Sequence, residues 1–108
     1  MKKIITLAAL MTLVTLTIPA RAVDAAAVMD LAQQNGCLAC HAIDQKLVGP
    51  AWKDVGKKYS GDSAAAEQLA TKIKKGTKGA WGSVPMPPNP TVTDADIRTL
   101  VEFVLTLK

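Results

Sequence analysis

Histidine and cysteine are scarce in this sequence: one His and two Cys stand among 108 residues. Two cysteines allow one disulfide or one shared ligand site, so a disulfide framework is excluded. Aromatic residues number only four, and a chain this short buries a modest fraction of its surface. Such small domains usually depend on a disulfide, a metal, a cofactor or a partner chain for stability. Intrinsic disorder is excluded as well, because 49% of the residues are apolar.

The first 22 residues have the pattern of a secretory signal peptide. A basic start is followed by a run over residues 4–18 that is apolar apart from threonine, and Pro19 ends this run. Small residues then occupy the −3 and −1 positions of a cleavage site after Ala22. An uncleaved membrane anchor is the alternative, but spanning a bilayer takes about 20 apolar residues. We therefore expect cleavage, export to the periplasm, and one domain over residues 23–108.

Positive charge is weak once this leader is removed. The leader holds three basic residues and no acidic one, so residues 23–108 carry ten basic and nine acidic residues. The net charge of +1 removes the main support for nucleic-acid binding. The basic residues are nevertheless concentrated, with a local balance of +5 over residues 46–78. Such a charge run is either a solvated face or a surface that helps to orient an acidic partner.

Apolar residues recur with helical spacing in four parts of the mature chain, and no part alternates as a strand does. The expected helices cover residues 23–35, 51–60, a segment from Asp62 or Ser63 to Gly76, and a last segment that Thr93 caps. The segment 80–92 holds four prolines and no periodicity, which predicts an ordered loop.

The faces of these helices have little bulk. In the third helix, for example, the expected buried face consists of Ala66, Leu69, Ala70 and Ile73. Small aliphatic side chains of this kind do not fill the centre of a domain by themselves. We therefore expect that something else fills the centre.

Both cysteines and the histidine fall in one run, Cys37-Leu38-Ala39-Cys40-His41. Cys-x-x-Cys-His is the attachment signature of c-type haem. Thiols three positions apart can reach the two vinyl groups of one porphyrin, and the next residue then offers its imidazole to the iron as an axial ligand. This spacing predicts one covalently bound haem c.

Three other interpretations of the motif are weaker. A thioredoxin-like redox pair needs a βαβ context, and no strand is expected here. A structural zinc site needs four ligands, and no second cluster exists. A disulfide between Cys37 and Cys40 would close a very small loop and would leave His41 without a role.

The second axial ligand must come from elsewhere, because the sequence has no other histidine. Met29 lies near the apolar stripe of the first expected helix, where a methionine normally fills the core. Met86 stands in Val84-Pro85-Met86-Pro87-Pro88, where prolines fix the backbone on both sides. A thioether held in this way suits iron, so we expect Met86 to be the sixth ligand.

Three segments in this order, GCLACHAID, VGPAW and AWGSVPMPPN, resemble those of the small bacterial class I c-type cytochromes, the cytochrome c-551 (c8) type. The resemblance spans essentially all of residues 23–108. It implies an all-α fold, the class I cytochrome c fold, with four to five helices wrapped around one covalently attached haem. The N- and C-terminal helices are expected to cross.

The resemblance also assigns roles around the two iron ligands. The carbonyl of Pro50 resembles the acceptor for Nδ1–H of His41, and a proline that opens a helix is compatible with this role. Asn89 resembles the residue whose amide contacts the Met86 sulfur, the alternative being an ordinary turn asparagine.

Two further side chains match positions near the haem propionates. Trp81 resembles the tryptophan whose indole N–H meets a propionate, with plain packing as the alternative. Lys72 matches a basic position near a propionate, although a solvated lysine on a helix face fits equally well. Trp52 departs from the family pattern, since close relatives often have tyrosine there.

Function follows from the two ligands and from the resemblance. With His41 and Met86 bound, the iron has no open position, so a one-electron carrier is expected and an enzyme is not. Relatives are soluble periplasmic carriers that commonly feed nitrite reductases or terminal oxidases. We expect a monomer without membrane insertion that docks through apolar groups at the haem edge, among them Leu38, Ala39 and Val48 and the Pro87-Pro88 loop. A small haem peroxidase or a gas-binding module is the alternative, and either requires Met86 to leave the iron.

Overall fold

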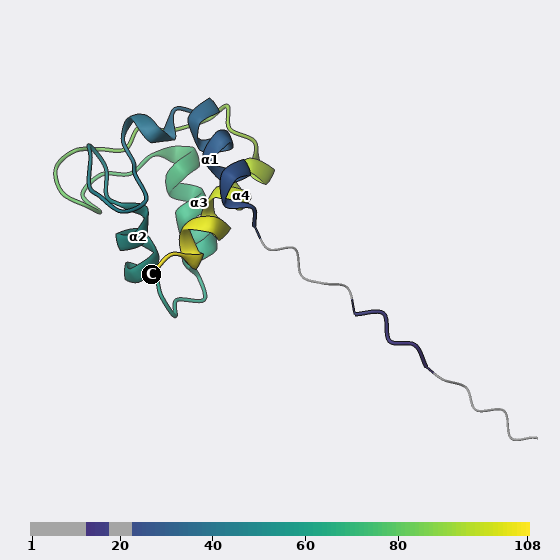
Figure 1. Ribbon diagram of the computed structural model, residues 1–108. Helices are drawn as coiled ribbons and strands as arrows, with labels where there is room; N and C mark the ends of the chain where they lie inside the picture. Colours follow the sequence, from purple (N-terminus) through teal and green to yellow (C-terminus); the bar gives the residue numbers. More distant parts are fainter. Residues whose placement is uncertain (1–12, 18–22) are drawn as a thin grey trace, which may run out of the picture.

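The computed structural model of the chain describes residues 13–17 and 23–108. Residues 13–17 have no regular secondary structure and lie apart from the helical domain (Figure 1). The expected cleavage site after Ala22 lies outside the described residues. Within the described ranges, no helix is long and apolar enough to cross a membrane.

Helices form the domain, as the sequence predicts (Figure 1). They are α1 (Ala25–Gln34), the short 3₁₀ helix η1 (Cys37–Ala39), α2 (Trp52–Lys58), α3 (Ala65–Lys75) and α4 (Asp94–Thr106). The part of the chain that the structure describes contains no strand, and its only β pairing consists of two isolated bridges.

Side chains cap the first and the last helix, and the Thr93 cap is the expected one. The Asp24 carboxylate accepts a hydrogen bond from the Ala26 N–H at 3.1 Å, and Thr93 Oγ1 accepts one from the Asp96 N–H at 3.1 Å. Each cap satisfies one of the N–H groups that the first helical turn leaves free. After α1 the chain turns at Gly36, whose φ of 73° lies in the left-handed region.

The third helix differs from the prediction at its start. It begins at Ala65 with Ala64 as N-cap, and Asp62 instead accepts a hydrogen bond from the Ala64 N–H at 2.9 Å, just before the helix. Ala65 is buried together with Leu69, whereas Ala66 is exposed, so the prediction for Ala66 was wrong. Two adjacent alanines are equally apolar, and only the packing of α3 on α4 decides which one is covered.

The core is organised around α4, which packs against α1, α2 and α3 (Figure 1). The contact between α1 and α4 brings together the helices nearest the two ends of the domain, as expected. Buried core side chains come from all four α-helices, from the C-cap of α2 and from the loop before α4; they are Val28, Ala32, Trp52, Val55, Tyr59, Ala65, Leu69, Val92, Ile97, Leu100, Val101, Phe103 and Val104.

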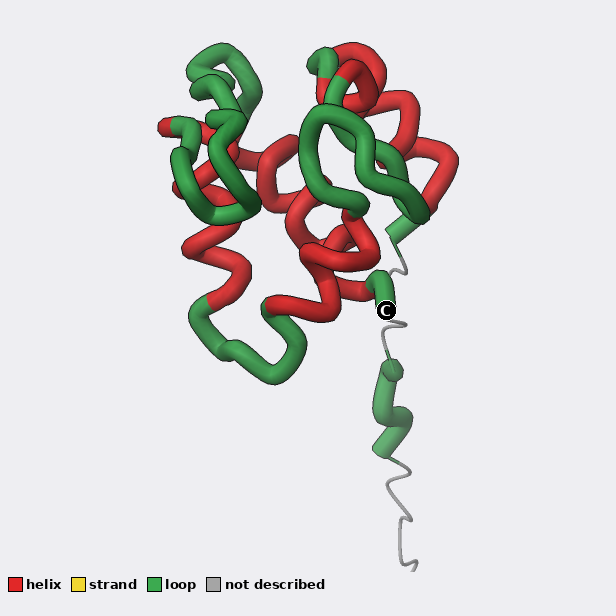
Figure 2. Tube along the Cα trace, turned by 90° about the vertical axis from the view of Figure 1, so that its left-hand side faces the viewer, coloured by secondary structure: helices red, strands yellow, loops and turns green. Residues whose placement is uncertain are grey.

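Two long connections leave this helical core, residues 40–51 and 76–93. Residues 40–51 and the first part of residues 76–93 lie toward the left of Figure 1. Figure 2 faces that side and shows the loops in front of the helices. Each loop is held by an isolated bridge or by backbone hydrogen bonds to its surroundings, so the proline-rich segment is ordered, as predicted.

Candidate functional site

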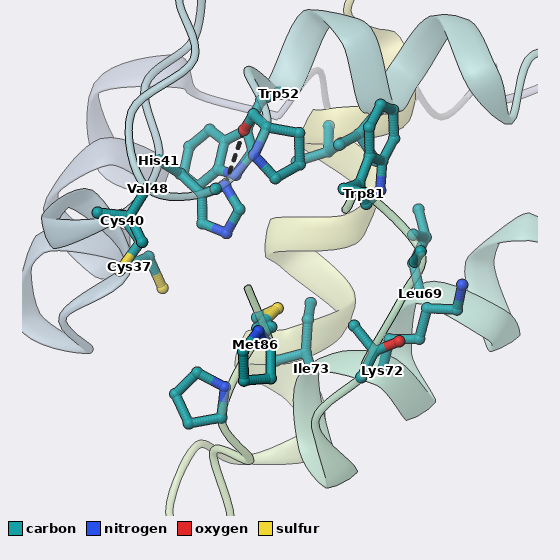
Figure 3. A pocket seen from close by; sticks show the side chains of 18 of the residues that line it. Cys37, Cys40, His41, Val48, Trp52, Leu69, Lys72, Ile73, Trp81 and Met86 are labelled. Carbon is teal, nitrogen blue, oxygen red and sulfur yellow. Dashed lines mark hydrogen bonds between the residues drawn. The ribbon is translucent and has the colours of Figure 1, made fainter. Parts of the chain in front are cut away.

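A cavity opens between these loops and the helices. Most of its wall is apolar: Val55 of α2, Leu69 and Ile73 of α3 and Val101 of α4 form its inner side. The outer sides come from the segment around Cys37–Pro50 and from residues 77–87 (Figure 3). The small side chains on the helix faces leave room for this cavity next to the core.

The two cysteines lie on one side of this cavity (Figure 3). Cys37 begins η1 and Cys40 follows its end, so one helical turn brings both thiols to the same wall. Both are free and half-buried. Burial raises the pKa of the Cys37 thiol above its ordinary value, against a smaller lowering by a backbone hydrogen bond. The thiol is therefore held neutral in the absence of a reaction partner.

His41 follows directly, because its N–H continues the turn with a hydrogen bond to the Cys37 carbonyl at 3.0 Å. Its Nδ1 lies 2.8 Å from the carbonyl oxygen of Pro50. A carbonyl only accepts, so Nδ1 carries the proton and Nε2 is left with its lone pair free. The Pro50 contact expected from the resemblance is present. The imidazole projects into the cavity (Figure 3).

Close packing fixes the plane of this imidazole. A Cβ atom at Gly49 would lie 2.6 Å from His41 Cε1, so only glycine fits beside the ring. On another side Trp52 stacks on the imidazole, with ring centroids 6.0 Å apart and an interplanar angle of 28°. The Gly49 N–H donates to the Cys40 carbonyl at 2.7 Å and ties this loop to the cysteine segment. The ring therefore has little freedom to turn.

Met86 comes from the opposite wall. In Figure 3 it lies across the cavity from His41. It is half-buried and lines the cavity together with Pro85 and Pro87. By contrast, Met29 packs against the core and does not line the cavity, in line with its expected role as core filler.

The residues expected near the propionates also line the cavity. Lys72 donates to the Tyr59 hydroxyl at 2.9 Å, and its Nζ lies 5.6 Å from the centre of that ring. Trp81 is 36% exposed at the mouth. The Nζ of Lys58 lies 4.5 Å from the Trp81 ring centre and donates to the Ala80 carbonyl at 3.1 Å.

Asn89 is placed differently from the expectation. Its side-chain amide donates to the Ile73 carbonyl at 3.1 Å and to the Pro87 carbonyl at 3.2 Å. The contact to the Met86 sulfur is not among its hydrogen bonds. The physical reason is the end of α3, where the carbonyl of Ile73 lacks a complete set of helical partners and attracts the amide.

Sequence reasoning missed several residues that shape the site. Gly49 seats the histidine ring, Thr77 pairs with the methionine segment, and Lys58 covers Trp81. Only Gly49 had a signal, since it stands between a valine and the Pro50 that accepts from His41. The other two contacts join segments far apart in the chain, and no local pattern marks them.

The donor set fits a flat haem. Two thiols at one edge match its two vinyl groups, a free imidazole nitrogen and a thioether face each other, and the wall between them is apolar. Zinc is the wrong occupant, because the described residues hold no group of three or more His, Cys, Asp or Glu that could bind a metal ion. The thioredoxin-like alternative fails because the described part of the chain has no strand for a βαβ unit.

Comparison of the sequence with known proteins also indicates a c-type cytochrome. The Cytochrome c family model matches residues 25–108. The chain is 53% identical to cytochrome c-552 of Nitrosomonas europaea over 79 residues, which cover 73% of this chain and 77% of that protein. It is 55% identical to cytochrome c-552 of Hydrogenobacter thermophilus over 78 residues, 72% of this chain and 79% of that protein.

Structural comparison gives the same result. The crystal structure of wild-type Nitrosomonas europaea cytochrome c552 matches with a TM-score of 0.72 and 52% identity, covering 74% of this chain and 99% of that chain. The predicted all-α class I cytochrome c fold is thus confirmed. The chain therefore belongs to the cytochrome c family, as a class I c-type cytochrome of the c-551 type with one covalently bound haem c.

Proposed function

We propose that this haem-binding electron carrier works in the periplasm as a monomer, without enzymatic activity, and shuttles single electrons between proteins of a respiratory chain. The proposal includes removal of residues 1–22 and axial ligation of the iron by His41 Nε2 and Met86 Sδ. Cys37 and Cys40 provide the two thioether bonds. A nitrite reductase or a terminal oxidase is the kind of acceptor that the resemblance implies.

The observation that carries the proposal is the opposition of His41 and Met86 across one apolar cavity (Figure 3). Haem supplies the one-electron chemistry, and a His/Met ligand pair raises its reduction potential. His41 and Met86 would hold the haem iron from its two sides, and the apolar wall would limit the access of water. With no free position, small molecules have nowhere to bind at the metal, and electron transfer is the reaction that is left.

Other groups around the cavity act on His41 and on the haem propionates. The Pro50 carbonyl, 2.8 Å from Nδ1, raises the basicity of the imidazole and keeps its tautomer. Lys72 and Trp81 line another side of the cavity, and Lys58 lies over the Trp81 ring, so two cationic groups and an indole N–H suit the propionates. We propose that these groups orient the propionates.

The mouth of the cavity offers a docking surface for redox partners. Val48, Trp81 and Val84 line it and are 55%, 36% and 60% exposed. Ala39 and the Pro87-Pro88 loop are exposed as well, whereas Leu38 packs partly against the core. Redox encounters bury little area and must separate quickly, which such a small apolar surface permits.

Intact mass and ligand replacement test the proposal. Periplasmic material should have the mass of residues 23–108 plus one haem, and Cys37→Ala should reduce the yield of that species. Met86→Ala should abolish the Met–iron charge-transfer absorption of the oxidised form and lower the potential. Met29→Leu, a swap of similar volume, is the control and should change neither property.

A ligand-binding assay separates the carrier from a peroxidase or a gas sensor. Cyanide and carbon monoxide should bind the wild type slowly at neutral pH, because Met86 must first leave. Rapid binding to the wild type would contradict the carrier and favour the other two classes.

A further inference from the structure

The C-terminal end of α3 carries the segment that presents Met86. Thr77 and Met86 exchange two backbone hydrogen bonds, from the Thr77 N–H to the Met86 carbonyl at 3.0 Å and from the Met86 N–H to the Thr77 carbonyl at 2.9 Å. The Ile73 carbonyl accepts from both the backbone and the side chain of Asn89, at 3.0 and 3.1 Å. Residues at and just after Met86 are thus bonded to the short stretch 73–77.

Gly76 lies at the centre of this attachment. Its φ of 77° is in the left-handed region, where the chain turns away from α3. A Cβ atom there would lie 2.7 Å from the Met86 carbonyl oxygen, 2.9 Å from the Pro88 nitrogen and 3.2 Å from the Pro87 carbonyl carbon. These are backbone atoms, so they cannot rotate aside as the end of a flexible side chain can.

Other left-handed glycines lack this contact. Gly61 has the same φ of 77° and Gly79 has a φ of 75°, and a Cβ atom at either position would meet nothing within 4 Å. At Gly61 and Gly79, glycine is therefore required only by the backbone conformation of the turn. At Gly76, glycine is required both by the turn and by the backbone of the methionine segment, which lies too close for a side chain.

We propose that Gly76 is a positioning residue for Met86: the bare backbone at the end of α3 sets how far the Met86 thioether reaches toward His41. The inference rests on the proposed function, in which Met86 is the sixth ligand. Adding a methyl group at position 76 forces the Met86 carbonyl from 2.7 Å to an ordinary contact of 3.4 Å or more. The two Thr77 bonds and the flanking prolines pass this displacement to the methionine, because they leave the segment little room to bend locally.

The test compares Gly76→Ala with Gly61→Ala in the haem-loaded protein. Both variants place alanine at a φ of 77°. Gly76 also has a ψ of 172°, a region that glycine almost alone adopts, so the two variants are compared by readouts at the iron and not by stability. In Gly76→Ala the Met–iron charge-transfer absorption should weaken, and cyanide should bind the oxidised form roughly tenfold faster, as a weaker sulfur bond requires. In Gly61→Ala both properties should match the wild type. Equal absorption and equal cyanide rates in the two variants would overturn the inference.

Met86→Ala separates this inference from the proposed function. If the absorption persists in Met86→Ala, the proposed ligation itself fails. If it disappears there and stays intact in Gly76→Ala, the ligation stands and the positioning role of Gly76 is refuted. Should Gly76→Ala not accumulate, Gly76→Asn provides the same Cβ on a side chain that can hydrogen-bond the neighbouring backbone, with Gly61→Asn as its control.

Discussion

Replacing Gly49 by alanine tests how tightly the histidine is seated. The new Cβ atom would lie 2.6 Å from His41 Cε1, 3.0 Å from Nδ1 and 3.1 Å from Nε2, so the ring must move as a whole. Gly49 is not among the glycines of positive φ, so alanine adds a contact here and no left-handed strain. The substitution therefore isolates the seat of the imidazole.

Two costs add up in this variant. Overpacking of a filled site costs about 1–3 kcal/mol, and loss of the 2.8 Å bond from Nδ1 to the Pro50 carbonyl costs about 1 kcal/mol more. We expect the free energy of unfolding of the haem-loaded protein to fall by about 2–4 kcal/mol, a large share of the stability of a small domain.

The reduction potential should rise in the same variant. Nδ1 bonded to a carbonyl makes the imidazole a stronger donor, which favours the oxidised iron, and this preference disappears with the bond. For a one-electron couple, a tenfold change in the equilibrium constant between oxidised and reduced forms corresponds to about 59 mV. A loss of about 0.5–1 kcal/mol of that preference therefore predicts a rise of about 20–40 mV.

Denaturant unfolding and voltammetry measure the two effects. Gly61→Ala is the control, because its Cβ atom would meet nothing within 4 Å and lies outside the cavity wall. Gly61→Ala should leave the reduction potential unchanged, although alanine at a positive φ lowers the free energy of unfolding. An unfolding free energy of Gly49→Ala within about 0.5 kcal/mol of the wild type, together with an unchanged potential, would refute the seating argument.

Other substitutions probe the frame around the site. Thr93→Ala removes the cap that accepts from the Asp96 N–H, so denaturant unfolding should show a loss of about 1 kcal/mol with an unchanged spectrum. Tyr59→Phe deletes the acceptor of Lys72; unfolding should become easier by about 1 kcal/mol, and an unchanged midpoint would mean that water replaces the hydroxyl at no cost. If lysines steer docking, electron transfer to an acidic partner should slow between 0.01 M and 0.15 M salt, as the Debye length falls from about 30 Å to about 8 Å. A flat salt profile combined with a large rate loss in Val48→Asp would leave apolar contact as the whole account.

Local patterns determined the chemistry and the helices of this protein. Cys37, Cys40 and His41 lie within five residues, so one helical turn suffices to bring two thiols and an imidazole to one wall. The Thr93 cap and the helical spacing of α4 are likewise local, because they follow from the first-turn N–H groups and from the 3.6-residue period. Sequence alone was enough for these features.

Tertiary structure decided the features that depend on close approach between distant segments. The choice of Ala65 over Ala66, the amide partners of Asn89, and the need for glycine at Gly49 and Gly76 all depend on which backbone lies within a few ångströms. A sequence shows periodicity along one segment, but it carries no record of the distance between two. For that reason the sequence indicated which side chains form the site, and only the fold determined the distances between them.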